Sequence, residues 1–168
     1  AIADADAIII RSETRVTRDL LEGTNVRFVG TATIGTDHVD LPYLERSGIA
    51  FAAAPGSNAN SVAEYVVAGL LEHSRRQGAP LAGMTIGIVG VGNVGSRVAR
   101  FARALGMKVL LNDPPLARAT GDPLYLPLDG LMGAEVITLH VPLTTEGADP
   151  TLHLFDARRL ALMKKGAL

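Results

Sequence analysis

The segment 84–95, MTIGIVGVGNVG, constrains the fold of this chain more than any other stretch. An apolar, partly β-branched run, typical of a buried parallel strand, leads directly into a G-x-G-x-x-G motif formed by Gly90, Gly92 and Gly95. The apolar residues that follow recur at helical spacing, and residues 107–111 then predict a second strand. Strand, glycine turn, helix and strand in this order indicate a βαβ unit of a parallel sheet.

Each glycine of this motif has a separate role if the unit binds a dinucleotide. Gly90 permits the tight turn, Gly92 lets a pyrophosphate approach the main chain, and Gly95 lets the helix pack closely on the strand. The amide groups at the helix N-terminus then hold the phosphates. Asp113 ends the second strand 23 residues after Gly90 (113 − 90), where a carboxylate accepts the hydroxyl groups of the adenosine ribose. It also repels a 2′-phosphate, so the motif favours NAD over NADP.

Two alternatives concern the residues around Asp113. A glycine turn in an ordinary α/β core would leave Asp113 as a solvated turn residue before two prolines. Arg118 lies close enough in sequence to meet a 2′-phosphate, which would favour NADP. The stretch 114–127 is rich in Pro, Gly and Ala, and we predict a surface loop there.

Composition excludes several classes of function. The 168 residues are 48% hydrophobic and carry a net charge of −1, which gives no electrostatic footprint for a nucleic-acid partner. The chain has no cysteine, so disulfides, thiolate metal sites and a cysteine nucleophile are excluded, and no metal site is predicted. The apolar run 62–71 is too short to span a bilayer, so we expect a cytoplasmic protein without a membrane partner.

The ends of the chain indicate a piece of a longer protein. The sequence begins at Ala1, without methionine and directly before an apolar run. It stops just after Gly166, where a helix has ended and another strand is predicted to begin. We therefore expect both ends to be internal positions of a larger polypeptide.

Strands and helices are predicted to alternate along the whole chain, which indicates an α/β fold. The architecture expected is a Rossmann-type doubly wound parallel sheet plus a partial flavodoxin-like substrate domain. A capping box from Ser61 to Glu64 opens a long helix, which we expect to be buried and to connect the two domains. The predicted domains are a partial substrate domain, residues 1–58, and a partial NAD-binding domain, residues 59–168. The other expected elements are strands at 7–10, 26–29, 49–54 and 136–139, and helices at 16–21, 41–47, 62–77, 128–132 and 157–165, with Asp40 and Asp156 as caps.

Several polar residues follow predicted strands, where ligands bind in open α/β sheets. Ser12 is either a hydroxyl donor to a substrate or, like Thr14, the cap of the next helix. The loop 30–36, with two glycines and three threonines, is suited to a phosphate or a carboxylate. His140 is either a general base or a residue that fixes its loop by hydrogen bonding, which we favour. His38 has no metal-ligand partner at suitable spacing, so we expect a structural hydrogen bond.

These segments resemble the D-2-hydroxyacid dehydrogenase family, whose enzymes oxidise a 2-hydroxy acid by hydride transfer to a nicotinamide. The resemblance extends over nearly the whole chain. Within the family, the loop 30–38, the Asp113-Pro-Pro turn and the segment 142–154 are most similar to members that oxidise 4-phospho-D-erythronate in vitamin B6 biosynthesis. The segments that carry the family resemblance are 11–16 (RSETRV), 35–40 (GTDHVD), 54–58 (APGSN), 61–65 (SVAEY), the glycine motif and 139–143 (LHVPL).

The resemblance implies a cofactor site for NAD around the glycine motif. Asn93 and Val94 match positions on the pyrophosphate, and Asp113 matches the acid on the adenosine ribose. Val141 matches a position on the nicotinamide side that is often threonine in this group. The resemblance also implies a homodimer.

The resemblance further implies that Ser12 and Thr33 contact a phosphorylated 2-hydroxy acid. The arginine, glutamate and histidine of the family's chemistry are expected beyond the strand that begins at Ala167, so no catalytic residue is assigned here. The 168 residues alone are therefore predicted to be inactive. One alternative is a relative acting on phosphoglycerate or glycerate, against which the loop 31–33 argues. Another is a non-catalytic NAD-sensing module, which would lack the arginine in its full-length form.

Overall fold

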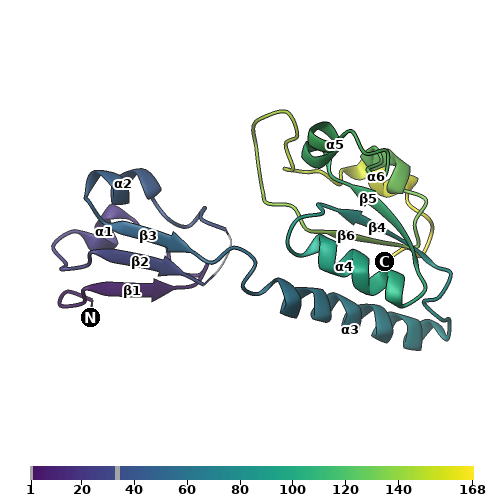
Figure 1. Cartoon of the computed structure of the whole chain (residues 1–168), viewed down its shortest axis with the longest axis horizontal. Helices are drawn as coiled ribbons and strands as arrows, with labels where there is room; N and C mark the ends of the chain where they lie inside the picture. The colour runs from purple at the N-terminus through teal and green to yellow at the C-terminus, as the bar shows by residue number, and fades with distance from the viewer. Residues whose placement is uncertain (1, 33–34) are drawn as a thin grey trace. The chain divides into compact units, whose positions relative to one another are not determined.

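The computed structural model describes residues 2–32 and 35–168. The chain divides into two compact units, Ala1–Asn58 and Ala59–Leu168. Each unit contains a three-stranded parallel sheet with helices packed against it, so the predicted α/β fold class is confirmed (Figure 1). No helix within the described part of the chain is long and apolar enough to cross a membrane.

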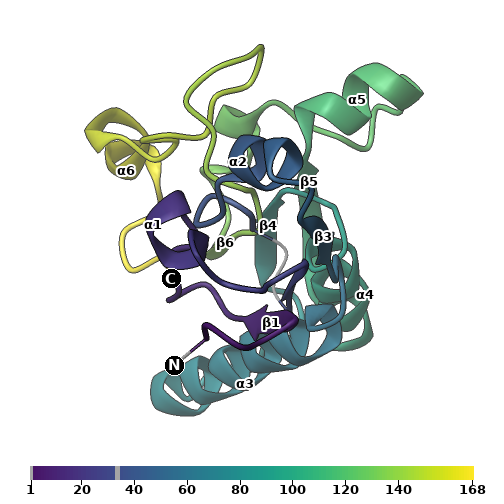
Figure 2. The same cartoon turned by 90° about the vertical axis from the view of Figure 1, so that its left-hand side faces the viewer.

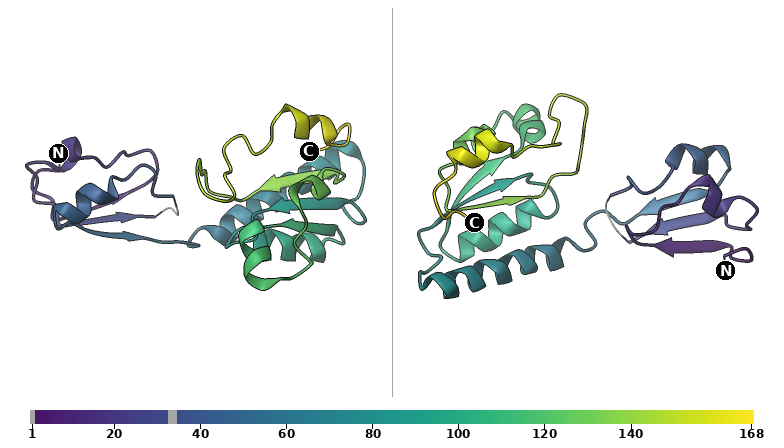
Figure 3. Two further views of the ribbon diagram at one scale, coloured as in Figure 1. Left: turned by 90° about the horizontal axis from the view of Figure 1, so that it is seen from above. Right: turned by 180° about the vertical axis from the view of Figure 1, so that it is seen from behind.

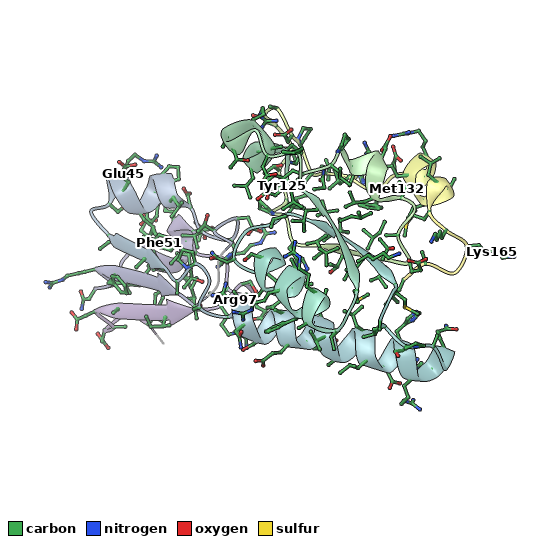
Figure 4. The ribbon with its side chains drawn as sticks, turned by 45° about the vertical axis from the view of Figure 1, so that its right-hand side comes forward. Glu45, Phe51, Arg97, Tyr125, Met132 and Lys165 are labelled. Atoms are coloured by element: carbon green, nitrogen blue, oxygen red, sulfur yellow. The ribbon has the colours of Figure 1, made fainter. Side chains whose placement is uncertain are left out.

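The sheet of the first unit has the strand order β1 (Ala7–Ile10), β2 (Phe28–Thr31), β3 (Ala50–Ala53). Its two helices lie on the same side of the sheet (Figure 1), and Val16, Val29 and Leu44 are fully buried between the layers. Figure 4 labels Phe51, which packs against this core, and Glu45, an exposed residue of α2 (Leu41–Arg46). The elements of this unit are β1 (Ala7–Ile10), α1 (Arg18–Leu21), β2 (Phe28–Thr31), α2 (Leu41–Arg46) and β3 (Ala50–Ala53).

The described residues cover only one face of this sheet, so the prediction of a buried strand at residues 7–10 is wrong for half of its side chains. Ile10 is buried in the core, whereas Ile9 faces the other way and is 72% exposed. Gly30 lies beside Ile9 on that open face, where an added Cβ would come within 2.7 Å of Ile9 Cδ1. A continuous apolar run is buried on both faces of a strand only when other elements cover both faces of the sheet.

Helix starts in the first unit follow one prediction and contradict another. Asp40 caps α2, because its carboxylate accepts the N–H of Tyr43 at 3.0 Å. Neither Ser12 nor Thr14 caps α1, whose N-cap is Thr17 without a side-chain hydrogen bond. The strand predicted at 26–29 is found as β2 two residues later (28 − 26), where Phe28 is the first residue to pair with β1, opposite Ala7.

In the sheet of the second unit, β4 (Thr85–Val89) lies between β5 (Lys108–Asn112) and β6 (Val136–Leu139), so the chain passes from the central strand first to one neighbour and then to the other side. The main chain of Leu168 also bonds to Glu135 and Ile137 beside β6, where the sequence predicts another strand. Asp156 caps the last helix by accepting the N–H of Arg159, as predicted. The elements are α3 (Ala59–Gln77), β4 (Thr85–Val89), α4 (Gly95–Ala104), β5 (Lys108–Asn112), α5 (Pro114–Thr120), η1 (Leu128–Leu131), β6 (Val136–Leu139) and α6 (Ala157–Leu162).

Both faces of this second sheet are covered (Figures 1 and 3). Helices α3 and α4 pack on the face of Ile86 and Ile88. On the other face, Leu131 of η1 and Met132, labelled in Figure 4, pack with Leu154, Phe155 and Met163, which flank α6. Gly87 gives Leu131 this room, because an added Cβ would lie 3.1 Å from the Leu131 side chain.

Helix α3 differs from its prediction in start and in burial. It begins at Ala59, three residues before the expected start (62 − 59), so the proposed capping box lies inside the helix. Glu64 instead accepts a hydrogen bond from the side chain of Asn60 at 2.5 Å. The helix is not buried all round: Tyr65 is 81% exposed and Leu71 is 50% exposed. Its apolar composition exceeds what α4 and the sheet cover.

Residues 114–120 form helix α5, which corrects the surface loop predicted there. The carboxylate of Asp113 accepts the N–H of Leu116 at 3.0 Å and caps the helix. Proline is tolerated in a first turn because the amide groups there have no partner within the helix. Gly121 ends α5 in the left-handed conformation, with φ of 67°.

Glu135 connects three segments of the second unit. Its Oε2 accepts the N–H of Thr85 at 2.8 Å, and its Oε1 accepts a hydrogen bond from the Lys164 ammonium. The bond from Lys164, followed by the bond from Thr85, lowers the pKa of Glu135 to about 2. The ionised carboxylate therefore contributes to the stability of this unit.

We predict that Glu135→Gln lowers the free energy of unfolding at neutral pH. A carboxyl group with a depressed folded-state pKa stabilises above its unfolded pKa of 4.5 and loses that contribution as pH falls toward about 2. The difference between wild type and variant in urea unfolding should therefore shrink between pH 4.5 and 2. Glu146→Gln is the control, since Glu146 has no hydrogen-bond partner among the described residues. An equal pH dependence in both variants would contradict the assignment.

Candidate functional site

A cavity of about 480 Å³ lies at the carboxyl end of the second unit's sheet. The ends of β4, β5 and β6 form its walls, at the point where the strand order reverses. Ligands of open α/β sheets bind at such switch points, and small-molecule sites typically have volumes of roughly 300–1,000 Å³. The residues at these strand ends that line the cavity are Val89, Gly90, Gly92, Asn112, Asp113, His140, Val141 and Pro142.

The glycine motif forms the turn from β4 into α4, and two of its glycines are required by the protein itself. Gly90 has a φ of 85°, and an added Cβ would lie 2.6 Å from the carbonyl oxygen of His140. A Cβ on Gly95 would lie 1.9 Å from the carbonyl oxygen of Gly90. Gly92 is different, because no described atom lies within 4 Å of its Cβ position. The space beside Gly92 is therefore open to a ligand.

The main chain beside this open space carries unpaired donors. The amide groups of Gly92, Asn93 and Val94 donate no hydrogen bond to any described residue. They precede α4, a helix of ten residues whose N-terminus carries a partial positive charge. Arg97, labelled in Figure 4, donates to the carbonyl oxygen of Asn93 at 2.5 Å and holds the turn in place. Free amides and an open approach at Gly92 fit a phosphate or pyrophosphate group.

Asp113 is a fixed part of the cavity wall rather than a solvated turn residue. Its Oδ2 accepts the N–H of Val91 at 2.8 Å, and its Oδ1 accepts the N–H of Leu116 at 3.0 Å. The carboxylate thus connects the glycine turn to the start of α5. Because each carboxylate oxygen accepts more than one hydrogen bond, both oxygens retain capacity for a ligand's hydroxyl groups.

His140 and Val141 form the wall at the end of β6. The Nε2 atom of His140 lies 3.0 Å from the hydroxyl of Thr138, the residue on the same face of the strand. Burial lowers the pKa of His140, so its ring is neutral at neutral pH. This hydrogen bond supports the loop-fixing role of His140. Val141 is partly buried against the Gly90 turn and presents an apolar side chain to the cavity.

Sequence reasoning did not identify Asn112 as part of this site. Asn112 is a buried polar residue whose Nδ2 donates to the carbonyl oxygen of Leu126 at 2.7 Å. Its own carbonyl oxygen accepts the N–H of Gly90 at 2.8 Å. The available signal was a polar side chain at the last position of an otherwise apolar strand.

The loop that follows β6 closes one side of the cavity. The sequence indicated this segment as part of the family resemblance but did not predict that it lines the site. Figure 2 shows it extending from the sheet between α5 and α6. The main-chain N–H of Thr144 donates to the Thr151 hydroxyl at 2.8 Å, and the N–H of Thr151 donates to the Thr144 hydroxyl at 3.1 Å. Within the loop closed by these bonds, Asp149 forms an ion pair with Arg118 of α5.

Ser12, Thr33 and His38 belong to the first unit. Ser12 is exposed in the turn after β1, and its hydroxyl has no hydrogen-bond partner among the described residues. Thr33 lies outside the described residues. His38 is buried, yet neither of its ring nitrogens hydrogen-bonds to a described residue, contrary to the structural bond predicted. No group of three or more described His, Asp or Glu side chains is placed to hold a metal ion.

Comparison with known proteins identifies relatives of the whole chain. The profile of the D-isomer specific 2-hydroxyacid dehydrogenase catalytic domain matches residues 1–155. The chain is 57% identical over 172 aligned residues to an erythronate-4-phosphate dehydrogenase from Salinibacter ruber and 53% identical to one from Chromohalobacter salexigens. An NAD⁺-bound 3-phosphoglycerate dehydrogenase of Entamoeba histolytica is structurally similar, with a TM-score of 0.70 and 32% identity over 85% of this chain and 48% of that one.

The two curated relatives are longer than this chain. The alignments cover 99% and 100% of the chain but 44% of each relative. The 168 residues therefore span less than half the length of the relatives that they match.

We predict opposite effects for two alanine substitutions in the glycine turn. Gly95→Ala should lower the free energy of unfolding by about 3 kcal/mol, because its Cβ meets main chain that cannot move aside. Gly92→Ala should leave it unchanged or raise it by up to about 1 kcal/mol, since its site is open and its φ is not positive. Urea unfolding of both variants tests this contrast. Similar losses of stability would show that the space at Gly92 is not free.

Proposed function

Because the chain belongs to the D-isomer specific 2-hydroxyacid dehydrogenase family, we propose that the protein containing it oxidises 4-phospho-D-erythronate to the 2-oxo acid with NAD. The observation that carries the cofactor assignment is the group formed by the open space at Gly92, the unpaired amides beside it and the carboxylate of Asp113. The two erythronate-4-phosphate dehydrogenases and the NAD⁺-bound 3-phosphoglycerate dehydrogenase to which the chain is similar support the reaction and the cofactor.

In the proposed cofactor site, the glycine turn binds the pyrophosphate. The amide groups of Asn93 and Val94 donate to it, while Gly90, Gly92 and Gly95 shape the turn around it. NAD held there by the glycine turn and Asp113 would supply the hydride acceptor for oxidation of the carbon that carries the 2-hydroxyl group.

The protein side of this site orients the cofactor and selects its ribose. Asp113 accepts the ribose hydroxyl groups, and its two main-chain hydrogen bonds fix the direction of the carboxylate beforehand. Val141 contributes an apolar contact at the nicotinamide side, in place of the hydroxyl that a threonine would provide. His140 keeps the end of β6 in place through Thr138.

We assign residues 1–58 to the substrate domain and residues 59–168 to the NAD-binding domain. Ser12 and Thr33 follow adjacent parallel strands of the first unit, and the proposed substrate has a phosphate dianion remote from the reacting carbon. Hydroxyl and main-chain N–H donors bind such a dianion without burying an unpaired charge. The arginine, glutamate and histidine of the reaction belong to other parts of the protein.

We further propose that the enzyme is a cytoplasmic homodimer. Helix α3 supports the dimer because it exposes Tyr65 and Leu71, large side chains that stable interfaces commonly bury. The lack of cysteine fits a reducing compartment.

The cofactor assignment predicts that Asp113→Asn weakens NAD binding by about tenfold or more, because hydrogen bonds to charged groups are worth roughly 1.5–3 kcal/mol. The gap between NAD and NADP should narrow at the same time, since the variant no longer repels a 2′-phosphate. Calorimetric titration of the full-length protein gives both affinities. Asp156→Asn is the matched control, because Asp156 also caps a short helix but lies outside the cavity. Unchanged NAD affinity in Asp113→Asn would refute the assignment.

The substrate assignment predicts that Ser12→Ala lowers kcat/KM for 4-phosphoerythronate by about tenfold, since one charge-assisted hydrogen bond is lost. The loss should be small for an unphosphorylated 2-hydroxy acid. Thr14→Val is the control, because it removes a hydroxyl from the same turn. Equal losses on both substrates would mean that Ser12 only shapes the loop.

A further inference from the structure

Asp149 forms an ion pair with Arg118, the arginine of helix α5, which begins directly after Asp113. Arg118 lies one helical turn after Pro114, which lines the cavity, so both residues share one side of α5. The Arg118 guanidinium forms two hydrogen bonds to the Asp149 carboxylate, Nη1 to Oδ1 at 3.1 Å and Nη2 to Oδ2. This fork engages both carboxylate oxygens with one edge of the guanidinium, a bidentate geometry that strengthens such a pair.

The loop presents Asp149 in a fixed position. The Thr151 hydroxyl donates to the carbonyl oxygen of Pro142 at 2.5 Å, and the Thr144 hydroxyl donates to that of Asp149 at 3.5 Å. The hydrogen bond to Arg118 lowers the pKa of Asp149 and raises that of Arg118, so both groups are charged at neutral pH. The pair therefore connects α5 to the loop across one side of the cavity.

The charge around the cavity is unfavourable for an added phosphate. Three carboxylates line it, those of Asp113, Glu146 and Asp149. Arg159 also lines it, but its guanidinium is engaged by Asp129 and by the carbonyl oxygen of Leu154. An arginine beside the ribose acid is what accommodates a 2′-phosphate in NADP-binding relatives of this fold. In this chain the arginine in that region is already neutralised.

We propose that Asp149 is a specificity-determining residue, which excludes NADP by holding the Arg118 guanidinium in an ion pair and so keeping it from a 2′-phosphate. This inference rests on the proposed NAD site. It assigns part of the cofactor selection to the loop after β6, separate from the acid at the end of β5. Arg118 is thus a phosphate-binding group that Asp149 keeps occupied.

The test is the affinity of the full-length protein for NAD and NADP, measured by calorimetry. Asp149→Asn should strengthen NADP binding by about tenfold or more, because it frees a guanidinium for a charge-assisted bond. NAD affinity should change by less than about threefold on the same free-energy scale, since NAD has no 2′-phosphate. The gain for NADP should shrink at high salt, as expected for an interaction between charges.

Two further variants separate the release of Arg118 from the loss of a negative charge. Glu146→Gln removes one carboxylate from the same cavity without releasing an arginine, so its gain for NADP should be clearly smaller. Adding Arg118→Met to Asp149→Asn should abolish most of the increase in NADP affinity, because the double variant has no guanidinium to bind the 2′-phosphate.

Three outcomes would overturn the proposal. Equal changes in NAD and NADP affinity would mean that the ion pair only holds the loop. A gain for NADP that persists without Arg118, or that Glu146→Gln reproduces, would mean that charge alone selects the cofactor. A wild-type protein that binds neither dinucleotide would refute the proposed function itself, whereas NAD binding without any effect of Asp149→Asn would refute only this inference.

Discussion

The close contact between the end of β4 and the start of α4 is the constraint on which the second unit depends. The Cα of Gly95 packs so near the carbonyl oxygen of Gly90 that no side chain fits between them. Helix α4 therefore begins directly after the end of the central strand, and the amide groups of Asn93 and Val94 before it donate to no described residue. The same turn brings Gly90 against the carbonyl group of His140 and so sets the distance between β4 and the end of β6. The cavity is a consequence of this packing.

Asp113 extends that constraint to the rest of the site. One oxygen holds the glycine turn through Val91, and the other starts α5 through Leu116. Because α5 begins at this point, Arg118 is placed where Asp149 of the next loop reaches it. A single carboxylate thus relates the turn, the helix and the loop that surround the cavity. Its replacement affects the site's geometry as well as any contact with a ligand.

The sequence predicted the features that depend on local pattern, including the fold class, the order of the elements and the caps at Asp40 and Asp156. The sequence-based predictions failed where burial depends on which elements pack over a face, and where prolines and helix caps in one segment favour different structures. The run 114–120 contains prolines, yet Asp113 and Gly121 supply both ends of a helix. The apolar faces of α3 and β1 are exposed because nothing described lies over Tyr65 or Ile9. Asn112 carried a signal, as a polar residue at the end of an apolar strand, but its partner Leu126 and the pairing of Asp149 with Arg118 are set by loops that cross the sheet ends and could not be predicted.

The polar groups that line the cavity or lie beside it fall into two classes with different physical roles. Asn112, Asp113 and Arg118 are already held by hydrogen bonds within the protein, so little conformational entropy remains to be lost when a ligand arrives. The amides of Asn93 and Val94 have no such partners, and leaving these donors unpaired is unfavourable wherever water is excluded. The paired groups therefore define the shape and charge of the cavity, while the unpaired donors contribute to the free energy of binding by forming new hydrogen bonds to the ligand. A side chain at position 92 would stand between a ligand and these unpaired donors. Glycine is therefore needed there for binding, although no described atom lies within 4 Å of its Cβ position.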